Sequence, residues 1–464
     1  MADNGLVIAG LGSGSGKTTL TLGMLRALTR RGTAVGAAKS GPDYIDTAFL
    51  TAACGTNAVN LDSHAMSQTM LCDLARRQAA PLLLIEGVMG LFDGTDGGSG
   101  STAALASALG LPVLLVIDVR HQAQTAAAIA AGIGTVLAPA GQLAGVVLNR
   151  VASDRHQTLI AEALSTHDIP LFGSLPSSPD IEVPSRHLGL VQAADLAAEN
   201  VLETRLDAAA DLVSEHLDLD SIMAAAAPLT RPETPDNASG SAASIPPIPM
   251  PPFLAPPGQR IAVAADAAFG FAYAHMLAYW RDAGAEILPF SPLADKAPAG
   301  DADAIFLPGG YPELHLPRLS TASRFLGGLR DAASKSVRIY GECGGFMTLG
   351  QRIIDKDGTA FSMAGLLDLE TSFAARKLHL GYRQVAARHG GWPGTTPLTA
   401  HEFHYTTATS ATGDPLFDAV TPSGKPLSIF TSPITITGGN ILAGINGKWY
   451  VQYALLGPGH PFNI

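Results

Sequence analysis

The sequence predicts an α/β fold in two domains, each built around a parallel β-sheet with covering helices. Short apolar runs without alternation, at residues 82–85, 113–117 and 145–148, are typical of strands buried on both faces. Ala-rich stretches of helical length separate these runs, as in strand–helix–strand crossovers. A length of 464 residues exceeds the usual size of one domain, so two compact units are expected.

A proline-rich segment marks the expected boundary between the domains. Residues 245–257 carry seven prolines, which exclude a regular helix or a central strand. We therefore expect three segments: a first domain at 1–222 with a doubly wound parallel sheet, a linker at 223–258, and a second α/β domain at 259–464. Strands of the second domain are expected at 261–264, 304–307 and 337–340.

Composition narrows the classes of function. The net charge of −11, without a cluster of Lys and Arg, argues against a nucleic-acid partner. The longest apolar stretch, residues 105–117, is shorter than the roughly 18–20 residues of a membrane span, so no membrane partner is expected. Cys54, Cys72 and Cys343 form neither a metal-binding pair nor a disulfide framework. With no signal-peptide pattern either, we expect a cytoplasmic protein.

A glycine-rich loop follows the first expected strand, at 6–9, and precedes a helical pattern at 20–31. In such a P-loop the backbone N–H groups and the helix N-terminus bind phosphate oxygens, while Lys17 reaches the outer phosphates and Thr18 binds Mg²⁺. The residues expected around the nucleotide are Gly12, Ser13, Gly14, Ser15, Gly16, Lys17, Thr18 and Thr19. ATP and Mg²⁺ are therefore the expected cofactors.

The spacing of this loop departs from the usual motif. Leu11 stands where a glycine is normal, and Gly10 lies one residue further upstream. This longer loop resembles the dethiobiotin synthetase branch of P-loop proteins.

Carboxylates follow two further segments of the first domain. Asp43 and Asp46 lie in a turn that Gly-Pro begins, close after Lys39, and Glu86 directly follows the strand expected at 82–85. Ligands of open α/β sheets bind at the carboxyl ends of the strands, so these acids are expected to face the nucleotide and its Mg²⁺. The alternative for Asp43 and Asp46 is that they cap the next helix.

A cysteine between glycines follows an expected strand of the second domain, in Gly341-Glu-Cys-Gly-Gly-Phe-Met347. Such a sharp strand-to-helix turn presents a nucleophile, and the helix N-terminus is expected to lower the pKa of the Cys343 thiol. The Pro-Gly-Gly sequence at 308–310 follows another strand and offers N–H groups to an oxyanion. The pair resembles the class I glutamine amidotransferase domain.

The motifs together resemble the cobyrinic or hydrogenobyrinic acid a,c-diamide synthase family. The matching segments are Lys39-Ser-Gly-Pro-Asp-Tyr-Ile-Asp46, Glu86-Gly-Val-Met-Gly-Leu-Phe-Asp-Gly94, Gly145-Val-Val-Leu-Asn-Arg-Val151, His187-Leu-Gly-Leu-Val191, Leu307-Pro-Gly-Gly-Tyr-Pro-Glu313, Leu380-Gly-Tyr-Arg383 and His401-Glu-Phe-His-Tyr405. The resemblance spans most of residues 5–410.

This resemblance implies a C–N ligase that amidates the a- and c-carboxylates of a corrinoid with ATP, with glutamine as nitrogen donor. It further implies a Mg-ATP and substrate site, Asn149 at the adenine, and a possible homodimer. The residues it places with the substrate are Asp43, Tyr44, Ile45, Asp46 and Asp93, and with the metal Thr18, Asp46 and Glu86. Metal-free hydrogenobyrinate, cobalt-containing cobyrinate and a nickel tetrapyrrole remain alternative substrates.

The base that would activate Cys343 is not evident. The resemblance leads us to expect a histidine near the C-terminus, but residues 439–450 carry Gly and Lys where it would fall, and from about residue 420 the chain no longer matches. His401 and His404 are the remaining candidates, and His460 lies in a Pro/Gly-rich end. A recruited histidine, a domain that uses free ammonia, and an altered C-terminus all stay open.

Two functions outside the family are also possible. A dethiobiotin-synthetase-like ligase would use the P-loop and leave the cysteine segment unused. A P-loop switch protein would bind a partner in a nucleotide-dependent way and form no amide.

Overall fold

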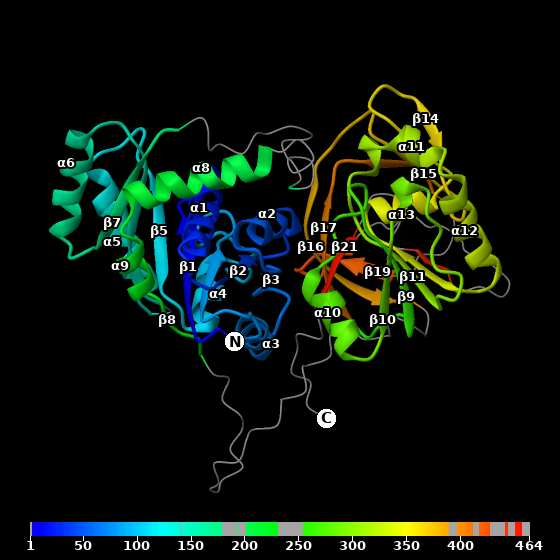
Figure 1. The fold of residues 1–464 in the computed structure, drawn as a ribbon, viewed down its shortest axis with the longest axis horizontal. Helices are drawn as coiled ribbons and strands as arrows, with labels where there is room; N and C mark the ends of the chain where they lie inside the picture. The colour runs from blue at the N-terminus through cyan, green and yellow to red at the C-terminus, as the bar shows by residue number, and fades with distance from the viewer. Residues whose placement is uncertain are drawn as a thin grey trace, which may run out of the picture. The chain divides into compact units, whose positions relative to one another are not determined.

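The computed structural model describes residues 2–139, 141–178, 193, 201–230, 254–388, 397–411 and 417–426, and the backbone of two strands at 441–443 and 451–456. Contacts within the chain define two compact units, Met1–Pro251 and Pro252–Ile464 (Figure 1). Within the described residues, no helix combines the length and the apolar character that a membrane crossing requires.

The first unit is a mostly parallel sheet in the order β3-β2-β4-β1-β5-β6-β7, to which β8 adds an antiparallel pairing with β1. Its strands are β1 Asn4–Gly10, β2 Val35–Ser40, β3 Val59–Leu61, β4 Leu82–Glu86, β5 Val113–Asp118, β6 Leu143–Val151, β7 Leu171–Pro176 and β8 Ala227–Pro228. Its helices are α1 Lys17–Arg30, α2 Tyr44–Cys54, α3 Gln68–Arg76, α4 Thr102–Leu109, α5 Thr125–Leu137, α6 Asp154–Ser165, α8 Val201–His216 and α9 Leu219–Ala224. The doubly wound α/β fold predicted from the sequence is confirmed.

The apolar runs became central strands because both sheet faces are covered. Val7, Ile8 and Ala9 of β1 are fully buried, and so are Leu115 and Ile117 of β5. The N-terminal end of the segment expected as a linker, 223–258, belongs to this unit, since β8 pairs with β1.

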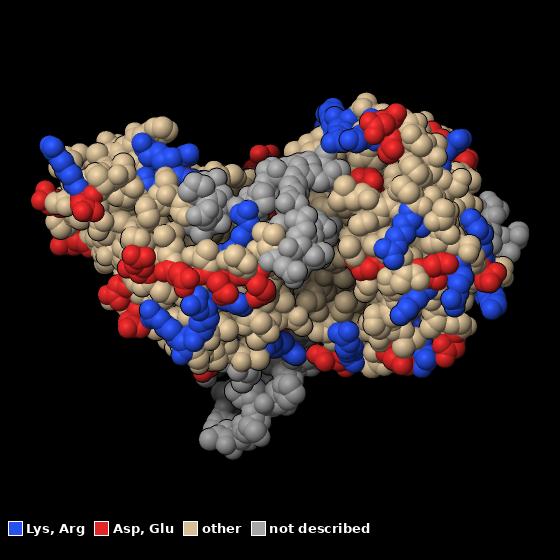
Figure 2. Space-filling view, turned by 45° about the horizontal axis from the view of Figure 1, so that its top comes forward, with Lys and Arg blue, Asp and Glu red and all other residues tan. Residues whose placement is uncertain are grey.

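Helix α8 runs across α1 (Figure 1), where charged side chains hold the two helices together. Arg26 pairs with Glu203 at 2.6 Å and with Asp207 at 2.8 Å, and Arg30 pairs with Asp211 at 2.8 Å. The row of acidic side chains across this unit in Figure 2 lies over α8. It is thus partly neutralised by the arginines of α1.

The second unit contains a parallel sheet in the order β10-β9-β11-β12-β20. Its elements are β9 Arg260–Ala264, α10 Ala274–Asp282, β10 Glu286–Phe290, η3 Pro292–Ala294, β11 Ala304–Leu307, η4 Pro312–Leu314, α11 Leu316–Ser320, α12 Ser323–Ser334, β12 Arg338–Gly341, α13 Gly344–Leu349 and β20 Ile441–Ala443. The expected strands 261–264, 304–307 and 337–340 correspond to β9, β11 and β12.

Two further four-stranded sheets, which the sequence did not lead us to expect, complete this unit. One has the order β14-β13-β15-β18 and the other β19-β16-β17-β21. Their strands are β13 Arg352–Ile354, β14 Ala360–Ser362, β15 Leu369–Ser372, β16 His379–Ala387, β17 Leu398–His404, β18 Thr407–Ala411, β19 Phe417–Val420 and β21 Val451–Leu456. The apolar core beneath the parallel sheet includes Cys343, Phe325, Phe346 and Leu349.

Candidate active sites

The glycine-rich loop lies at the carboxyl end of β1, between Gly10 and the first residue of α1, Lys17. Gly16 has a φ of 97°, and a Cβ atom there would lie 2.1 Å from the Nδ2 atom of Asn149. The Asn149 side chain donates a 2.9 Å hydrogen bond to the Ser15 carbonyl. Asn149, expected at the adenine, therefore also supports the backbone of the loop.

Lys17 crosses the loop and is held by two carbonyl oxygens. Its Nζ donates to Gly12 O at 2.9 Å and to Met89 O at 2.6 Å. Burial, followed by the nearby Lys39 ammonium, lowers the pKa of Lys17. The role of Lys17 at the outer phosphates of a nucleotide stays a prediction.

A buried lysine links the two acids that the sequence places at strand ends. Lys39 Nζ lies 2.6 Å from Asp46 Oδ2 and 2.9 Å from Glu86 Oε1, and Lys39 and Glu86 are only 4% and 0% exposed. Burial alone would lower the pKa of Lys39, but Asp46 and Glu86 outweigh it and the pKa is raised. Burial raises the pKa of Glu86, although Lys39 opposes this.

Oxygen donors suited to Mg²⁺ meet beside this lysine. Thr18 Oγ1 donates to Glu86 Oε1 at 2.6 Å. Glu86 Oε2 is buried without a hydrogen-bond partner in the described part of the chain. A buried carboxylate oxygen without a partner is costly unless a cation or water binds it. The hydroxyl and the two carboxylates therefore fit an oxygen-preferring cation, with Asp46 shared with Lys39.

Asp43, one of the expected substrate residues, caps helix α2. Its Oδ1 atom accepts from Ile45 N at 2.9 Å and from Asp46 N at 3.2 Å. The helix-cap alternative thus describes Asp43, but not Asp46, whose side chain pairs with Lys39. Burial and the neighbouring Asp46 charge raise the pKa of Asp43 to about 7.

The remaining expected substrate residues differ in exposure. Tyr44 and Ile45 are buried in the first turn of α2. Asp93 is exposed and accepts a 2.8 Å hydrogen bond from Gly90 N. Its charge also acts on Lys17, so the carboxylate lies near that ammonium.

An arginine that the sequence analysis did not single out holds the loop from the other side. Arg150 Nη1 donates to Gly14 O at 2.9 Å and to Asp118 Oδ2 at 2.8 Å. Its φ of 61° is unusual for a residue other than glycine. Burial would raise the pKa of Asp118, but Arg120 and Arg150 hold it below its usual value. The sequence did contain a signal for this contact: Asp118 ends an apolar strand pattern, and Arg150 directly follows Asn149.

In the second unit, Cys343 occupies the sharp turn between β12 and α13. Its φ of 46° and ψ of −111° are strained for a residue with a side chain. A Cβ atom on Gly345 would lie 2.0 Å from the Leu307 carbonyl oxygen, so only glycine allows the helix to start this close to β11. This geometry is that of a nucleophile turn.

The expectation of a lowered thiol pKa is wrong for this environment. Burial, followed by the Glu313 carboxylate, raises the pKa of Cys343 to about 12. The backbone N–H groups of Gly310 and Gly344 lower it, but they do not outweigh these effects. The resting sulfur is therefore a thiol, and a base must take its proton before it can attack.

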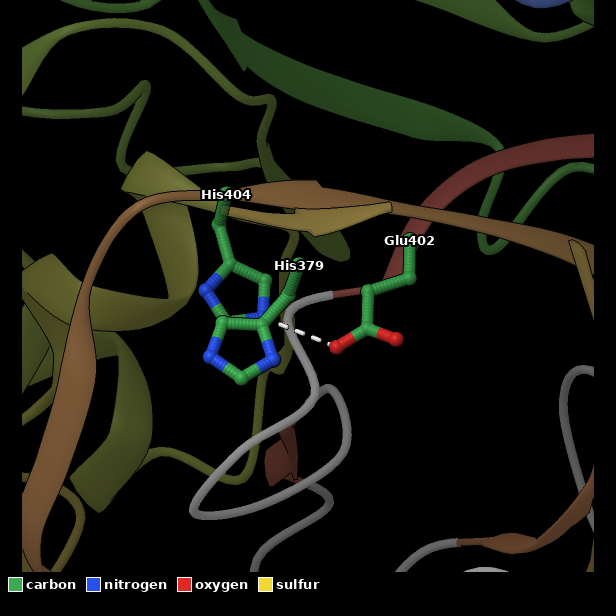
Figure 3. Close-up of side chains that lie close together, drawn as sticks. All are labelled: His379, Glu402 and His404. Carbon is green, nitrogen blue, oxygen red and sulfur yellow. Dashed lines mark hydrogen bonds and ion pairs between the residues drawn. The ribbon is translucent and has the colours of Figure 1, made fainter. Parts of the chain in front are cut away.

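The two candidate histidines lie on β17, in a different sheet from the one that Cys343 follows. Neither is among the groups that shift the pKa of Cys343 in the described residues. His404 is bonded to Thr406 O and Glu402 (Figure 3), while burial and Arg383 lower the pKa of His401 to about 3. The motif segment 187–191, residues 444–450 and His460 lie outside the described residues.

Comparison with known proteins covers most of the chain. Residues 6–191 match the CobQ/CobB/MinD/ParA nucleotide binding domain, and residues 260–431 match the CobB/CobQ-like glutamine amidotransferase domain. A hydrogenobyrinate a,c-diamide synthase of Brucella anthropi is 49% identical over 404 residues, which cover 86% of this chain and 88% of that protein. The chain belongs to the hydrogenobyrinate a,c-diamide synthase family.

Further members of the family match along nearly their whole length. The Mesorhizobium japonicum protein is 48% identical, and the matched residues cover 92% of this chain and 95% of that protein. The Rhodobacter capsulatus protein is 47% identical, with 91% and 94% covered. The P-loop site lies in the matched nucleotide binding domain, and the Cys343 turn lies in the matched glutamine amidotransferase domain. The resemblance seen in the sequence motifs is confirmed.

Proposed function

We propose that this chain is a C–N ligase of cobalamin biosynthesis that amidates the a- and c-carboxylates of hydrogenobyrinic acid, using ATP and glutamine. The observation that carries the proposal is the presence, in one chain, of a P-loop beside a buried acid pair and of a strained cysteine turn. The relatives' name supports the metal-free substrate over cobyrinate or a nickel tetrapyrrole. A dethiobiotin-synthetase-like ligase or a switch protein would leave the cysteine turn without a role.

The first unit would activate the carboxylate. A carboxylate resists attack by ammonia, so its oxygen first attacks the γ-phosphorus of ATP, which gives an acyl phosphate and ADP. Lys17 would exchange its two carbonyl partners for phosphate oxygens. Thr18, Asp46 and Glu86 would hold Mg²⁺, which neutralises phosphate charge when bound. Ammonia then attacks the acyl carbon, loses a proton and expels phosphate.

Residues around this centre would position the substrates. Lys39 keeps Asp46 and Glu86 paired, so that their charges repel the anionic substrates less. The Oδ1 atom of Asn149 would accept from the adenine amino group while Nδ2 stays on the loop. Asp43, Tyr44, Ile45 and Asp93 would form the side of the site that faces the corrinoid.

The second unit would release ammonia from glutamine. The Cys343 thiol gives its proton to a base, and the sulfur attacks the carboxamide carbon. The backbone N–H groups of Gly310 and Gly344, which donate hydrogen bonds to the Cys343 sulfur, would stabilise the oxyanion. Ammonia leaves, and water hydrolyses the thioester to glutamate and the free thiol.

Mass spectrometry of hydrogenobyrinic acid incubated with enzyme, ATP and Mg²⁺ tests the proposal. Two successive carboxylate-to-amide changes are expected with either glutamine or ammonia. Cys343→Ala should abolish only the glutamine-driven reaction, and Cys54→Ala serves as the matched control. Absence of amide under both conditions contradicts the ligase, whereas glutamine-driven amidation by Cys343→Ala contradicts the role of Cys343 alone. Parallel reactions with cobyrinic acid compare the substrates, and sedimentation tests the homodimer that we propose from the family.

A further inference from the structure

Two motifs of the second unit have no role in the proposed reaction, and the structure brings them together. The segments 380–383 and 401–405 lie on the antiparallel strands β16 and β17, where His379 is the register partner of His404. Glu402 and His404 point to the same face of β17 because side chains alternate along a strand. Figure 3 shows the three side chains His379, Glu402 and His404 gathered at one point.

The hydrogen bonds of His404 require a proton or a metal ion between its ring and Glu402. Its Nδ1 atom lies 3.0 Å from the Thr406 carbonyl oxygen, which can only accept, so Nδ1 carries a proton. In the neutral ring Nε2 then presents a lone pair, yet it lies 2.9 Å from the carboxylate oxygen Glu402 Oε1. Two acceptors at this distance need a cation between them, either a second proton or a metal ion.

The third side chain favours the metal ion. A proton joins two atoms, whereas His379 adds a third donor, and the ligand atoms of all three residues lie within 4.8 Å of one another. Two imidazoles and one carboxylate are ligands that zinc prefers, and Mg²⁺ or Ca²⁺ prefers oxygen alone. We propose that His379, Glu402 and His404 bind Zn²⁺ and thereby join β16 to β17.

The surroundings of the three residues support a metal site. Arg383 Nη2 holds the other oxygen of Glu402 at 2.5 Å, and Thr406 O orients His404 through Nδ1. Zinc ligands commonly have such partners, which fix the orientation of the donor atoms. The His379 and His404 rings are stacked at 4.6 Å, so His379 must turn toward Glu402 to complete the bonds of about 2.0–2.2 Å. His379 is only partly buried, so it is less tightly enclosed than Glu402 and His404.

Zinc binding by the full-length protein tests the site. The protein is freed of metal with a chelator and then titrated with Zn²⁺, with stoichiometry from elemental analysis and affinity from calorimetry. One tightly bound ion per chain is expected, with a thermal midpoint that rises with Zn²⁺. His379→Ala should weaken binding by about 100-fold or more, because it removes a direct ligand, while His121→Ala leaves binding unchanged. Co²⁺ should give a visible absorption band that His379→Ala loses.

Control variants separate this site from the cysteine turn. Cys343→Ala should bind Zn²⁺ as the wild type does, and Glu402→Gln should weaken binding as His379→Ala does. No uptake by the wild type would overturn the proposal. Uptake that survives His379→Ala and disappears in Cys343→Ala would also overturn it, because the ion would then be bound by the thiol. All these readouts are independent of amidation.

Discussion

Thr18 Oγ1 donates a 2.6 Å hydrogen bond to Glu86 Oε1 and so joins the first turn of α1 to the last residue of β4. These elements lie far apart in sequence, but β1 and β4 are neighbouring parallel strands. The contact places a carboxylate beside the phosphate loop, and the second oxygen of that carboxylate has no hydrogen-bond partner in the described part of the protein.

Replacing this carboxylate by an amide should stop the chemistry and preserve the fold. Glu86→Gln keeps the shape of the side chain but removes the charge that would hold Mg²⁺. We expect ammonia-driven amidation to fall by about 100- to 1,000-fold, with a circular dichroism spectrum like that of the wild type. Asp96→Asn, at an exposed acid downstream in the chain, is the control. A rate within a few-fold of the wild type would exclude Glu86 from the metal site.

Removing the buried lysine should destabilise the first unit. Lys39→Met leaves Glu86 and Asp46 as an uncompensated pair, which lowers the free energy of unfolding by about 3–5 kcal/mol. The loss should shrink in acid, where Glu86, whose pKa burial raises, takes up a proton. Hydrogen exchange of the β2 and β4 amides in urea measures it, since all three tryptophans lie in the second unit. The exposed Lys356→Met is the control, and equal protection in both variants would contradict the prediction.

Arg150 should matter for nucleotide binding more than for turnover. Arg150→Ala removes the hydrogen bonds to the Gly14 carbonyl and to Asp118, and their loss should raise the KM for ATP by about tenfold. The value of kcat should change little, because the hydrogen bonds of Arg150 to Gly14 O and Asp118 support the loop. Steady-state kinetics with ammonia measures both constants. Arg155→Ala on α6 is exposed and should behave as the wild type; a fall in kcat alone for Arg150→Ala would be inconsistent with this role.

The pH dependence of Cys343 alkylation reports the protonation of its thiol. Because burial and Glu313 raise the pKa to about 12, the small thiolate fraction grows about tenfold per pH unit and does not level off between pH 7 and 10. Iodoacetamide labelling followed by peptide mass spectrometry measures the rate, with glutathione as a reference that levels off above its own pKa. A plateau below pH 8 would instead reveal a base already paired with the sulfur.

The first unit was largely predictable because its signals are local. Gly16, Lys17 and Thr18 stand between a strand pattern and a helix pattern, and the structure keeps that order. The partners of Lys39 were not predictable in the same way. They depend on β2 lying beside β4, where Lys39 is the register partner of Glu86, and the sequence does not state the order of strands.

The second unit shows where sequence patterns fail. The strands β13, β14 and β15 are only three or four residues long, too short for a clear period, so their sheet was missed. The pairing of His379 with His404 joins two distant motifs, and it follows from a hairpin register that neither motif contains. The Cys343 thiol was misjudged because a helix end is visible in sequence, whereas burial is not.

The short strand β8 has a consequence for how the first unit can be handled. Asn4 pairs with Pro228, and Leu229 N donates to Asp3 O at 3.0 Å, so residues 3–4 and 228–229 lie side by side. A domain whose terminal segments lie close together can be circularly permuted or fused to another domain without a change in its core. The first unit should therefore tolerate circular permutation or fusion to another domain at this place.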